Sequence, residues 1–302
     1  ARDVFRSKPI VMLKAGVTSA GSRAVASHTG ALAGSEEAYR AACHRAGTLV
    51  VDSLQEQNDV AMALATQPLP LGNRVAILTN AGGPAALAAD ELARRGLSLA
   101  KLSDETQAAL RDVVPPGAQL GNPVDMLGGP DAEMYSAAGR ILIEDAGVDM
   151  LMAIFVPQVI TPVTAVAKNV VSVANDSDKP VICCLVGGES IPESMRLLNT
   201  SGVPCYQDPN RASRALGGLH QYSQLRTRPD LTPQPINDVN AKKAVTLLKG
   251  AWQKEGAGFL DAHTASRIAD AYGIPVPSSR LARTVEEAIG IADRIGFPVV
   301  MK

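Results

Sequence analysis

The chain has 302 residues, of which 46% are hydrophobic, 20% charged and only 3% aromatic, a composition typical of a globular protein with two or three domains. Because aromatic residues are so few, the cores must consist of Ala, Val, Leu and Ile, which favours parallel sheets covered by helices. The formal net charge of −1 offers no basic surface for nucleic acid, and the apolar run 148–160 is too short to cross a membrane.

The first block of the chain, residues 1–66, alternates strands with helices. We expect strands at 10–13 and 48–51, and helices at 35–44 and from Asp52 onward. This alternation predicts a parallel α/β sheet.

A histidine stands in a stretch of small residues, Ser27-His28-Thr29-Gly30-Ala31-Leu32-Ala33-Gly34, which we expect to be a loop before the helix at 35–44. A helix amino terminus has unpaired N–H groups and the positive end of the helix dipole, so it attracts anions. His28 is therefore a candidate to carry a phosphoryl group. The backbone amides of Thr29, Gly30 and Ala31 are candidates to donate hydrogen bonds to the phosphate. The alternative is an ordinary turn with an exposed histidine.

The second block, residues 74–225, follows a Pro-rich linker and has the pattern of a complete doubly wound domain of the flavodoxin type. Its expected strands are 74–78, 98–102, 150–156, 180–185 and 203–206. Its expected helices lie near 84–95, 104–113, 131–145, 162–174 and 189–199.

A glycine-rich turn, Thr79-Asn80-Ala81-Gly82-Gly83-Pro84, joins the first strand of this block to its helix. Glycine lets the backbone approach a ligand closely, so the turn predicts a second phosphate cradle that faces the first. Asn80, Gly82 and Gly83 are its candidate binding residues. The alternative is a routine strand-to-helix turn.

Residues 226–236 are rich in Pro, Thr and Arg and are expected to be a linker. The last block, residues 237–302, is expected to contain helices near 237–254, 261–271 and 284–294, followed by a strand at 297–301. The chain opens with Ala1 rather than Met and closes on Lys302 directly after that strand, so we expect a piece of a longer polypeptide.

Four cysteines are present: Cys43, Cys183, Cys184 and Cys205. They contain no CxxC pair, and no pair of His or Cys residues has the spacing of metal ligands. We therefore expect reduced thiols, a cytoplasmic location and no metal site within the chain.

Three stretches carry a resemblance to the nucleoside-diphosphate-forming acyl-CoA synthetases, relatives of succinyl-CoA synthetase. The stretch around His28 resembles their phosphohistidine loop. The glycine-rich turn and the segment Leu120-Gly121-Asn122-Pro123-Val124-Asp125 resemble their second domain. Asn122 and Asp125 could help to shape the site, but an Asn-Pro turn with Asp more often caps a loop, and we favour that interpretation. The pattern from Ala271 to Lys302 resembles the start of an ATP-grasp domain. The resemblance implies two flavodoxin-like parallel α/β subdomains followed by the first part of ATP-grasp.

The function that this resemblance implies is that of an ADP-forming acid–CoA ligase of the acetate–CoA ligase type, with His28 as the phosphoryl carrier. It also implies CoA, ADP or ATP, and Mg²⁺ as cofactors, phosphate and a carboxylic acid or acyl-CoA as substrates, Lys302 as a contact to nucleotide phosphates, and an oligomer. The family's CoA-binding domain and the rest of ATP-grasp are missing from the sequence, so we expect the chain alone to be inactive. The alternative is a non-catalytic regulatory region of a protein lysine acetyltransferase built on the same domains.

Overall fold

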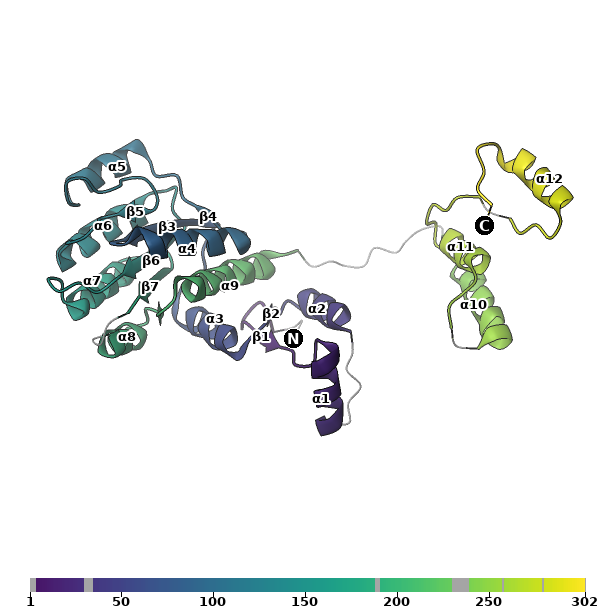
Figure 1. Cartoon of the computed structure of the whole chain (residues 1–302), viewed down its shortest axis with the longest axis horizontal. Helices are drawn as coiled ribbons and strands as arrows, with labels where there is room; N and C mark the ends of the chain where they lie inside the picture. Colours follow the sequence, from purple (N-terminus) through teal and green to yellow (C-terminus); the bar gives the residue numbers. More distant parts are fainter. Residues whose placement is uncertain are drawn as a thin grey trace. The chain divides into compact units, whose positions relative to one another are not determined.

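The chain folds into two compact units, Ala1–Pro229 and Asp230–Lys302, in a computed structural model (Figure 1). The structure describes residues 4–29, 35–187, 191–229, 239–256, 258–278 and 280–301, with only the backbone for 26–29 and 254–255. The helices in this described part of the chain fall short of the length and apolarity that crossing a membrane requires.

A small parallel sheet lies in the first unit and contains two strands, β1 (Val11–Leu13) and β2 (Leu49–Val51). Between them the chain forms the helices α1 (Ser19–Thr29) and α2 (Glu36–Arg45). The hydroxyl of Ser35 accepts a hydrogen bond of 3.1 Å from the N–H of Ala38. This cap satisfies one of the free N–H groups of α2 and explains why the helix begins directly after Ser35.

The large sheet is parallel and separate from the small one, with the order β4-β3-β6-β7-β8 and with β5 beside one end of β3. Its strands are β3 (Arg74–Thr79), β4 (Ser98–Leu99), β5 (Val124–Asp125), β6 (Met150–Phe155), β7 (Val181–Leu185) and β8 (Cys205–Tyr206). Leaving out the short β5, the strands follow one another as 2-1-3-4-5, the order of the flavodoxin type. The expected fold class is confirmed.

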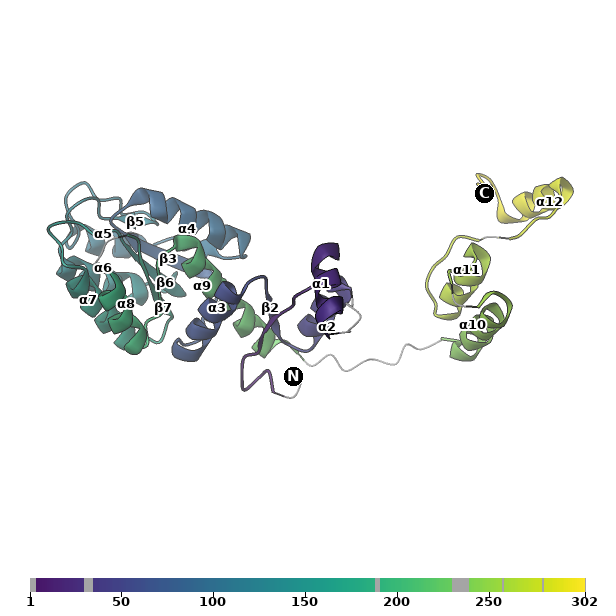
Figure 2. The same cartoon turned by 60° about the horizontal axis from the view of Figure 1, so that its bottom comes forward.

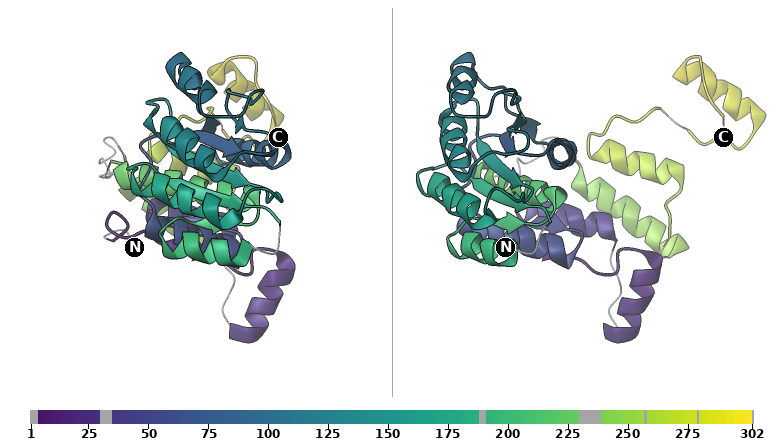
Figure 3. Two further views of the ribbon diagram at one scale, coloured as in Figure 1. Left: turned by 90° about the vertical axis from the view of Figure 1, so that its left-hand side faces the viewer. Right: turned by 60° about the vertical axis from the view of Figure 1, so that its left-hand side comes forward.

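Helices cover both faces of the large sheet, as Figures 2 and 3 show. One face carries α5 (Asp104–Arg111), α6 (Ala132–Glu144), α7 (Val163–Asn175) and α8 (Ile191–Thr200), and the other carries α3 (Leu54–Thr66), α4 (Gly82–Arg94) and α9 (Pro209–Thr227). Successive residues of β3 serve the two cores in turn: Ala76 and Leu78 pack on the first face, and Val75 and Ile77 on the second. This alternation is the period of two expected of a strand buried on both sides.

The helices α3 and α9 join the small sheet to the large one. In sequence α3 belongs to the first block, yet its residue Ala63 lies in the core of the large sheet, while Val60 packs with Tyr222 and Leu225 of α9 under the small sheet. The hydroxyl of Tyr222 donates a hydrogen bond of 2.7 Å to the carbonyl of Phe5. The two blocks seen in the sequence are therefore one compact unit with two sheets.

The second unit contains the helices α10 (Ala241–Glu255), α11 (Ala262–Ala271) and α12 (Val285–Ile295), close to the expected positions. The backbone N–H of Asn240 donates a hydrogen bond of 2.7 Å to the carbonyl of Ala271, which fastens the start of α10 to the end of α11. The expected strand at 297–301 does not form. A strand needs a neighbour for its N–H and C=O groups, and the described residues of this unit include no other strand.

Candidate functional site

The carboxyl ends of β3, β5 and β6 bring three loops together on one edge of the large sheet. The connection after β3 leads to α4 on one face, and the connection after β6 leads to α7 on the other face. Where neighbouring parallel strands lead to opposite faces, their loops diverge and leave a crevice, which is the usual ligand site of doubly wound folds. The glycine-rich turn predicted as a phosphate cradle lies at this point.

The amino terminus of α4 is open. Ala81 precedes the helix without a side-chain cap, and the hydroxyl of Thr79 bonds to the N–H and carbonyl of Ala81 instead, both at 3.0 Å. A Cβ atom placed on Gly83 would have no heavy atom within 4 Å. Free N–H groups in the first turn, at the positive end of the helix dipole and with space before them, fit a phosphate group.

The Asn80 side chain, predicted to bind phosphate, lies at this turn but points into the protein. Its Nδ2 donates to the carbonyl of Val156 and its Oδ1 accepts from the N–H of Val156, both at 2.9 Å. The residue is only 5% exposed. The carboxamide thus ties the loop after β3 to the loop after β6, and it positions the crevice.

Asn122 and Asp125, for which the sequence left open a role in the site or in capping a loop, have structural roles. Asn122 lies beside β3 in the gap between β4 and β5. Its carboxamide bonds the N–H of Ile77 at 3.0 Å and the carbonyls of Val75 and Ala100 at 2.7 and 3.0 Å. It therefore satisfies the N–H of Ile77, which lies between the parts of β3 that pair with β4 and β5, and it adds a second hydrogen bond to the carbonyl of Val75, which also accepts from the N–H of Ala100.

The carboxylate of Asp125 caps its own loop and borders the cradle. Its Oδ1 accepts a hydrogen bond of 2.9 Å from the N–H of Leu127. Its Oδ2 lies 3.2 Å from the point where a Cβ on Gly82 would be. The bond to Leu127 is the loop cap that the sequence favoured, and the short distance to Gly82 places the carboxylate beside α4.

The loops after β5 and β6, which the sequence did not single out, complete this edge. Leu127 has a φ of 60°, a conformation that bulky side chains rarely adopt. The N–H of Gly129 donates to Oε1 of Gln158 at 2.8 Å, and the hydroxyl of Thr161 donates to the carbonyl of Pro130 at 2.7 Å. Residues with a positive φ often occur at functional sites. The sequence does not indicate that a leucine would adopt this conformation.

His28 and Thr29 were expected in a loop, and their backbone instead forms the last turn of α1. The helix has a physical basis: the hydroxyl of Thr18 accepts a hydrogen bond of 3.1 Å from the N–H of Gly21 at its start, and the segment that follows is rich in alanine. The side chains of His28 and Thr29 are not described. Gly30, Ala31 and Lys302 lie outside the described residues.

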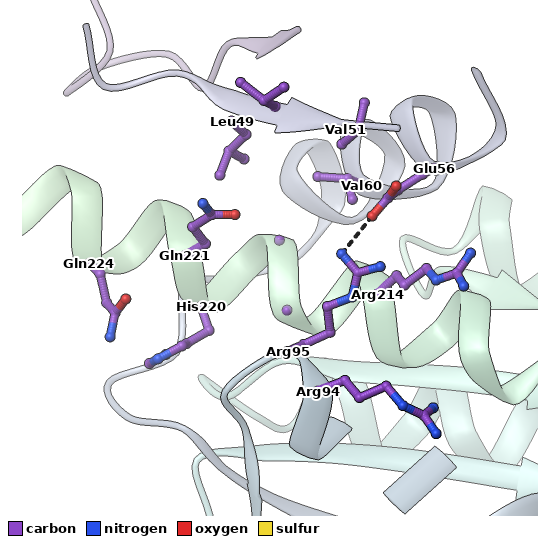
Figure 4. Close-up of a pocket in the computed structure, with 13 residues that line it drawn as sticks. Leu49, Val51, Glu56, Val60, Arg94, Arg95, Arg214, His220, Gln221 and Gln224 are labelled. Carbon is purple, nitrogen blue, oxygen red and sulfur yellow. Dashed lines mark hydrogen bonds and ion pairs between the residues drawn. The ribbon is translucent and has the colours of Figure 1, made fainter. Parts of the chain in front are cut away.

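A cavity of about 340 Å³ lies between the two sheets at the far end of α4 (Figure 4). Its wall includes three arginines and the carboxylate of Glu56, and Glu91 pairs with these arginines from behind the wall. Glu56 on α3 accepts a hydrogen bond of 2.9 Å from Arg95, and Glu91 accepts bonds of 3.0 Å from Arg95 and Arg214. Burial acts to raise the pKa of Glu91, but the arginines around it outweigh this effect and the pKa is lowered. The charges are paired with one another across α3, α4 and α9, so we assign this wall a structural role.

Metal binding finds no support in the described part of the chain, where no group of three or more His, Cys, Asp or Glu residues could hold an ion. Three cysteines, Cys183, Cys184 and Cys205, lie instead on the neighbouring strands β7 and β8. Cys183 lies directly opposite Cys205 on the neighbouring strand, and both are buried as free thiols. The hydrogen bond with Cys205, together with burial, raises the pKa of Cys183, so these thiols behave as small apolar core residues.

Comparison with known families matches three regions. Residues 1–64 match the succinyl-CoA ligase-like flavodoxin domain, residues 75–228 the Ligase-CoA domain, and residues 251–302 an ATP-grasp domain.

Individual relatives agree with these family matches. Acetate–CoA ligase [ADP-forming] I of Archaeoglobus fulgidus is 39% identical over 302 residues, which are 100% of this chain and 43% of that protein. The alpha subunit of acetate–CoA ligase [ADP-forming] II of Pyrococcus furiosus is 41% identical over 228 residues, 74% of this chain and 50% of the subunit.

A solved structure agrees as well. The dinucleotide-forming acetyl-coenzyme A synthetase 1 of Ca. Korarchaeum cryptofilum, in complex with phosphate and ADP, superposes with a TM-score of 0.71 at 33% identity. The match covers 74% of this chain and 49% of that one. The chain thus spans about half or less of the length of these relatives, and it belongs to the family of ADP-forming acetate–CoA ligases.

Proposed function

We propose that the full-length protein is an ADP-forming acid–CoA ligase that interconverts acyl-CoA, ADP and phosphate with acid, CoA and ATP. Phosphate displaces CoA from the acyl group and forms an acyl phosphate. His28 then takes the phosphoryl group and releases the acid, and ADP accepts the phosphoryl group from His28 to give ATP. The observation that carries the proposal is the open, uncapped amino terminus of α4 at the switch point of the sheet, in a chain whose relatives are ADP-forming ligases.

The carrier role suits His28 chemically, because a neutral imidazole nitrogen is a competent nucleophile near pH 7. Phosphoryl transfer requires mainly positioning and neutralisation of charge. In this proposal the amides of Gly82 and Gly83 bind one side of the phosphoryl group, and those of Gly30 and Ala31, which follow α1, bind the other side. The N–H of Thr29 is used within the last turn of α1 and takes no part. The Asn80 side chain supports the second cradle indirectly through Val156.

Cofactor binding extends this proposal beyond the described residues. The Korarchaeum relative holds phosphate and ADP, and the room in front of Gly83 supports a phosphate at α4 here. Lys302, at the end of the ATP-grasp match, is proposed to contact the nucleotide phosphates as a compact cation. Mg²⁺ is proposed to enter with the nucleotide. We assign the CoA site and most of the nucleotide site to domains that the longer relatives have in addition to this region.

The alternative function, regulation of an attached lysine acetyltransferase, has less support, because the relatives reported above are ligases.

Incubation of the full-length protein with ATP labelled on the γ-phosphate tests the proposal. We expect one phosphoryl group on the protein, labile in acid and stable in alkali, as a phosphoramidate is. The label must leave as ATP when ADP is added. No label, or a label stable in acid, would contradict the proposed function.

A further inference from the structure

The cavity between the two sheets has a charged end and an uncharged polar end (Figure 4). Arg94 and Arg95 from the end of α4 and Arg214 of α9 line the charged end. Gln221 and Gln224, about two and three turns further along α9, line the uncharged end. Ten residues of helix separate Arg214 from Gln224, a distance of about 15 Å. The cavity therefore has the length for a small molecule with two unlike ends.

The arginines of the charged end outnumber the carboxylates that pair with them. Glu56 and Glu91 form these structural ion pairs. All four of their oxygens accept a hydrogen bond, from an arginine or from the N–H of Asp52. The carboxylates are thus saturated, and one of the three positive charges remains uncompensated at this end of the cavity.

Most N–H groups of the arginines are left over by the ion pairs. A guanidinium has five N–H groups. Within the described part of the chain, Arg214 donates only through Nε and Arg94 only through Nη1. Arg95 donates through Nε and Nη1. The unused terminal nitrogens suit an oxyanion, because a guanidinium binds two oxygens of a phosphate or carboxylate at once.

The buried carboxylate of Glu91 holds the three arginines in place. It is 5% exposed and accepts from Nη1 of Arg94 at 3.2 Å and from Nε of Arg95 and Arg214 at 3.0 Å. The stem of Arg95 lies against Gly217, where an added Cβ would be 3.0 Å from the Cβ of Arg95. Arginines that are already ordered lose little conformational entropy when they bind an anion.

The rest of the wall offers hydrogen bonds without charge. The carboxamides of Gln221 and Gln224 have donors and acceptors and no partner among the residues that the structure describes. His220 also lines the cavity, and its Nδ1 is buried without a hydrogen-bond partner in the same part of the chain. Burial lowers the pKa of His220, and its ring bonds to the backbone of Gly72. Nδ1 of the neutral ring is therefore an acceptor that lacks a donor, and a hydroxyl group is such a donor.

We propose that this cavity binds a small phosphate monoester with a hydroxylated body. The terminal nitrogens of Arg94 and Arg214 hold the phosphate, and the body lies along α9 toward Gln221 and Gln224. A phosphate fits the arginines better than a carboxylate, because it has a higher charge and three terminal oxygens that two guanidiniums can share. A volume of about 340 Å³ is near the lower limit of small-molecule pockets, which favours a small ligand. The cavity lies at the opposite end of α4 from the phosphate cradle, so this inference goes beyond the proposed function.

Isothermal titration calorimetry of the full-length protein with ribose 5-phosphate, ribose and inorganic phosphate tests the inference. We expect ribose 5-phosphate to bind at least about tenfold more tightly than inorganic phosphate or ribose. Arg214→Gln should raise the Kd of ribose 5-phosphate at least about tenfold. Arg94→Gln should raise it too, and this side chain is 66% exposed, so its loss costs little stability. Only binding that these variants weaken is assigned to the cavity, which separates it from phosphate at the start of α4.

Gln221→Ala tests the uncharged end. It should raise the Kd of ribose 5-phosphate about threefold and leave the Kd of inorganic phosphate unchanged, because it removes a hydrogen bond to the body alone.

Arg140→Gln is the matched control. The Arg140 side chain is 40% exposed, close to the 38% of Arg214, and it also pairs with a carboxylate, that of Asp176. It lies on α6, on the other face of the large sheet. The variant should bind ribose 5-phosphate with the wild-type Kd.

Equal affinities for ribose 5-phosphate in the wild type, Arg94→Gln and Arg214→Gln would overturn the inference, as would no binding to the wild type at millimolar concentration. Inorganic phosphate that binds as tightly as ribose 5-phosphate would overturn the hydroxylated body. Binding is measured without turnover, so these outcomes are separate from the labelling of His28 that tests the proposed function.

Discussion

Asn80 and Val156 are joined by two reciprocal hydrogen bonds of 2.9 Å, although 76 positions separate them in the sequence. The carboxamide of Asn80 takes the place that a further strand residue would have, and it satisfies both backbone groups of Val156 just beyond the end of β6. The bond pair fixes the distance between the turn that opens α4 and the loop that carries Ile160. The geometry of the crevice therefore depends on one side chain that contacts no ligand in the proposed mechanism.

Replacement of Asn80 by alanine should lower the free energy of unfolding by about 1–3 kcal/mol, because two backbone groups of the half-buried Val156 lose their partners. Asn80→Asp should be no better, since its carboxylate can accept from the N–H of Val156 but repels the carbonyl. Urea denaturation of the chain measures both. The control is Asn73→Ala, which removes one bond to the carbonyl of Gly96 near solvent and should cost less than about 1 kcal/mol. Equal losses at the two positions would contradict this account of Asn80.

Acid should destabilise the first unit through Asp149. The hydrogen bonds from the Arg74 side chain and backbone N–H hold the pKa of this carboxyl below its usual value, against the opposing effect of burial. A carboxyl with a lowered pKa in the folded state contributes stability above its unfolded pKa of about 3.9, and this stability is lost as the pH falls further.

Thermal unfolding measured between pH 7 and pH 2.5 tests this pH dependence. Asp149→Asn should be less stable than the wild type at pH 7, and the difference should shrink as the pH falls below about 4. Arg74→Gln removes the donor and should flatten the same profile. A difference between wild type and Asp149→Asn that stays constant over the whole range would show that the pair does not carry this dependence.

The strands of the large sheet were predictable because β3, β6 and β7 are continuous apolar runs, the pattern of strands buried on both faces. The helix α9 was missed because its buried face consists largely of small residues, among them Ala212, Ser213 and Gly217. Small residues give no strong apolar period. They are there because α9 packs closely on α3: a Cβ on Gly218 would lie 2.6 Å from Val60.

The candidate site was predictable only where it is local in sequence. A strand, two glycines and a proline at a helix start are visible in the eleven residues from Arg74 to Pro84, so the turn at Gly82 and Gly83 could be found. The contact between the loops after β5 and β6 could not be found, because Gly129 and Gln158 come together only when β5 and β6 take their places on either side of β3. In the same way, the sequence could not show that the Asn80 side chain bonds to Val156, because the two residues are 76 positions apart.

Gly83→Ala should separate folding from phosphate binding. A Cβ at this position meets no heavy atom within 4 Å, and Gly83 lies inside α4, so alanine should leave the free energy of unfolding unchanged or raise it by up to about 1 kcal/mol. The added methyl group stands in the space proposed for phosphate. We expect the rate of His28 labelling by ATP in the full-length protein to fall by at least about tenfold.

Gly250→Ala is the matched control for Gly83→Ala. Gly250 lies inside α10, and its Cβ position is equally open. The substitution should give the same small gain in stability and leave the labelling rate at the wild-type value. Normal labelling in Gly83→Ala would show that the start of α4 does not bind the transferred phosphoryl group.

His28→Asn tests the phosphoryl carrier itself. Asparagine can form hydrogen bonds in the same place but has no nucleophilic nitrogen that accepts a phosphoryl group at neutral pH. In the full-length protein the acid-labile label from ATP and the net formation of ATP from acyl-CoA, ADP and phosphate should both disappear. The melting temperature should stay close to that of the wild type, because in this proposal His28 lies outside the core and asparagine is also polar. Full labelling of the variant would show that another residue carries the phosphoryl group. Unfolding of the variant would show that His28 has a structural role rather than the role of phosphoryl carrier.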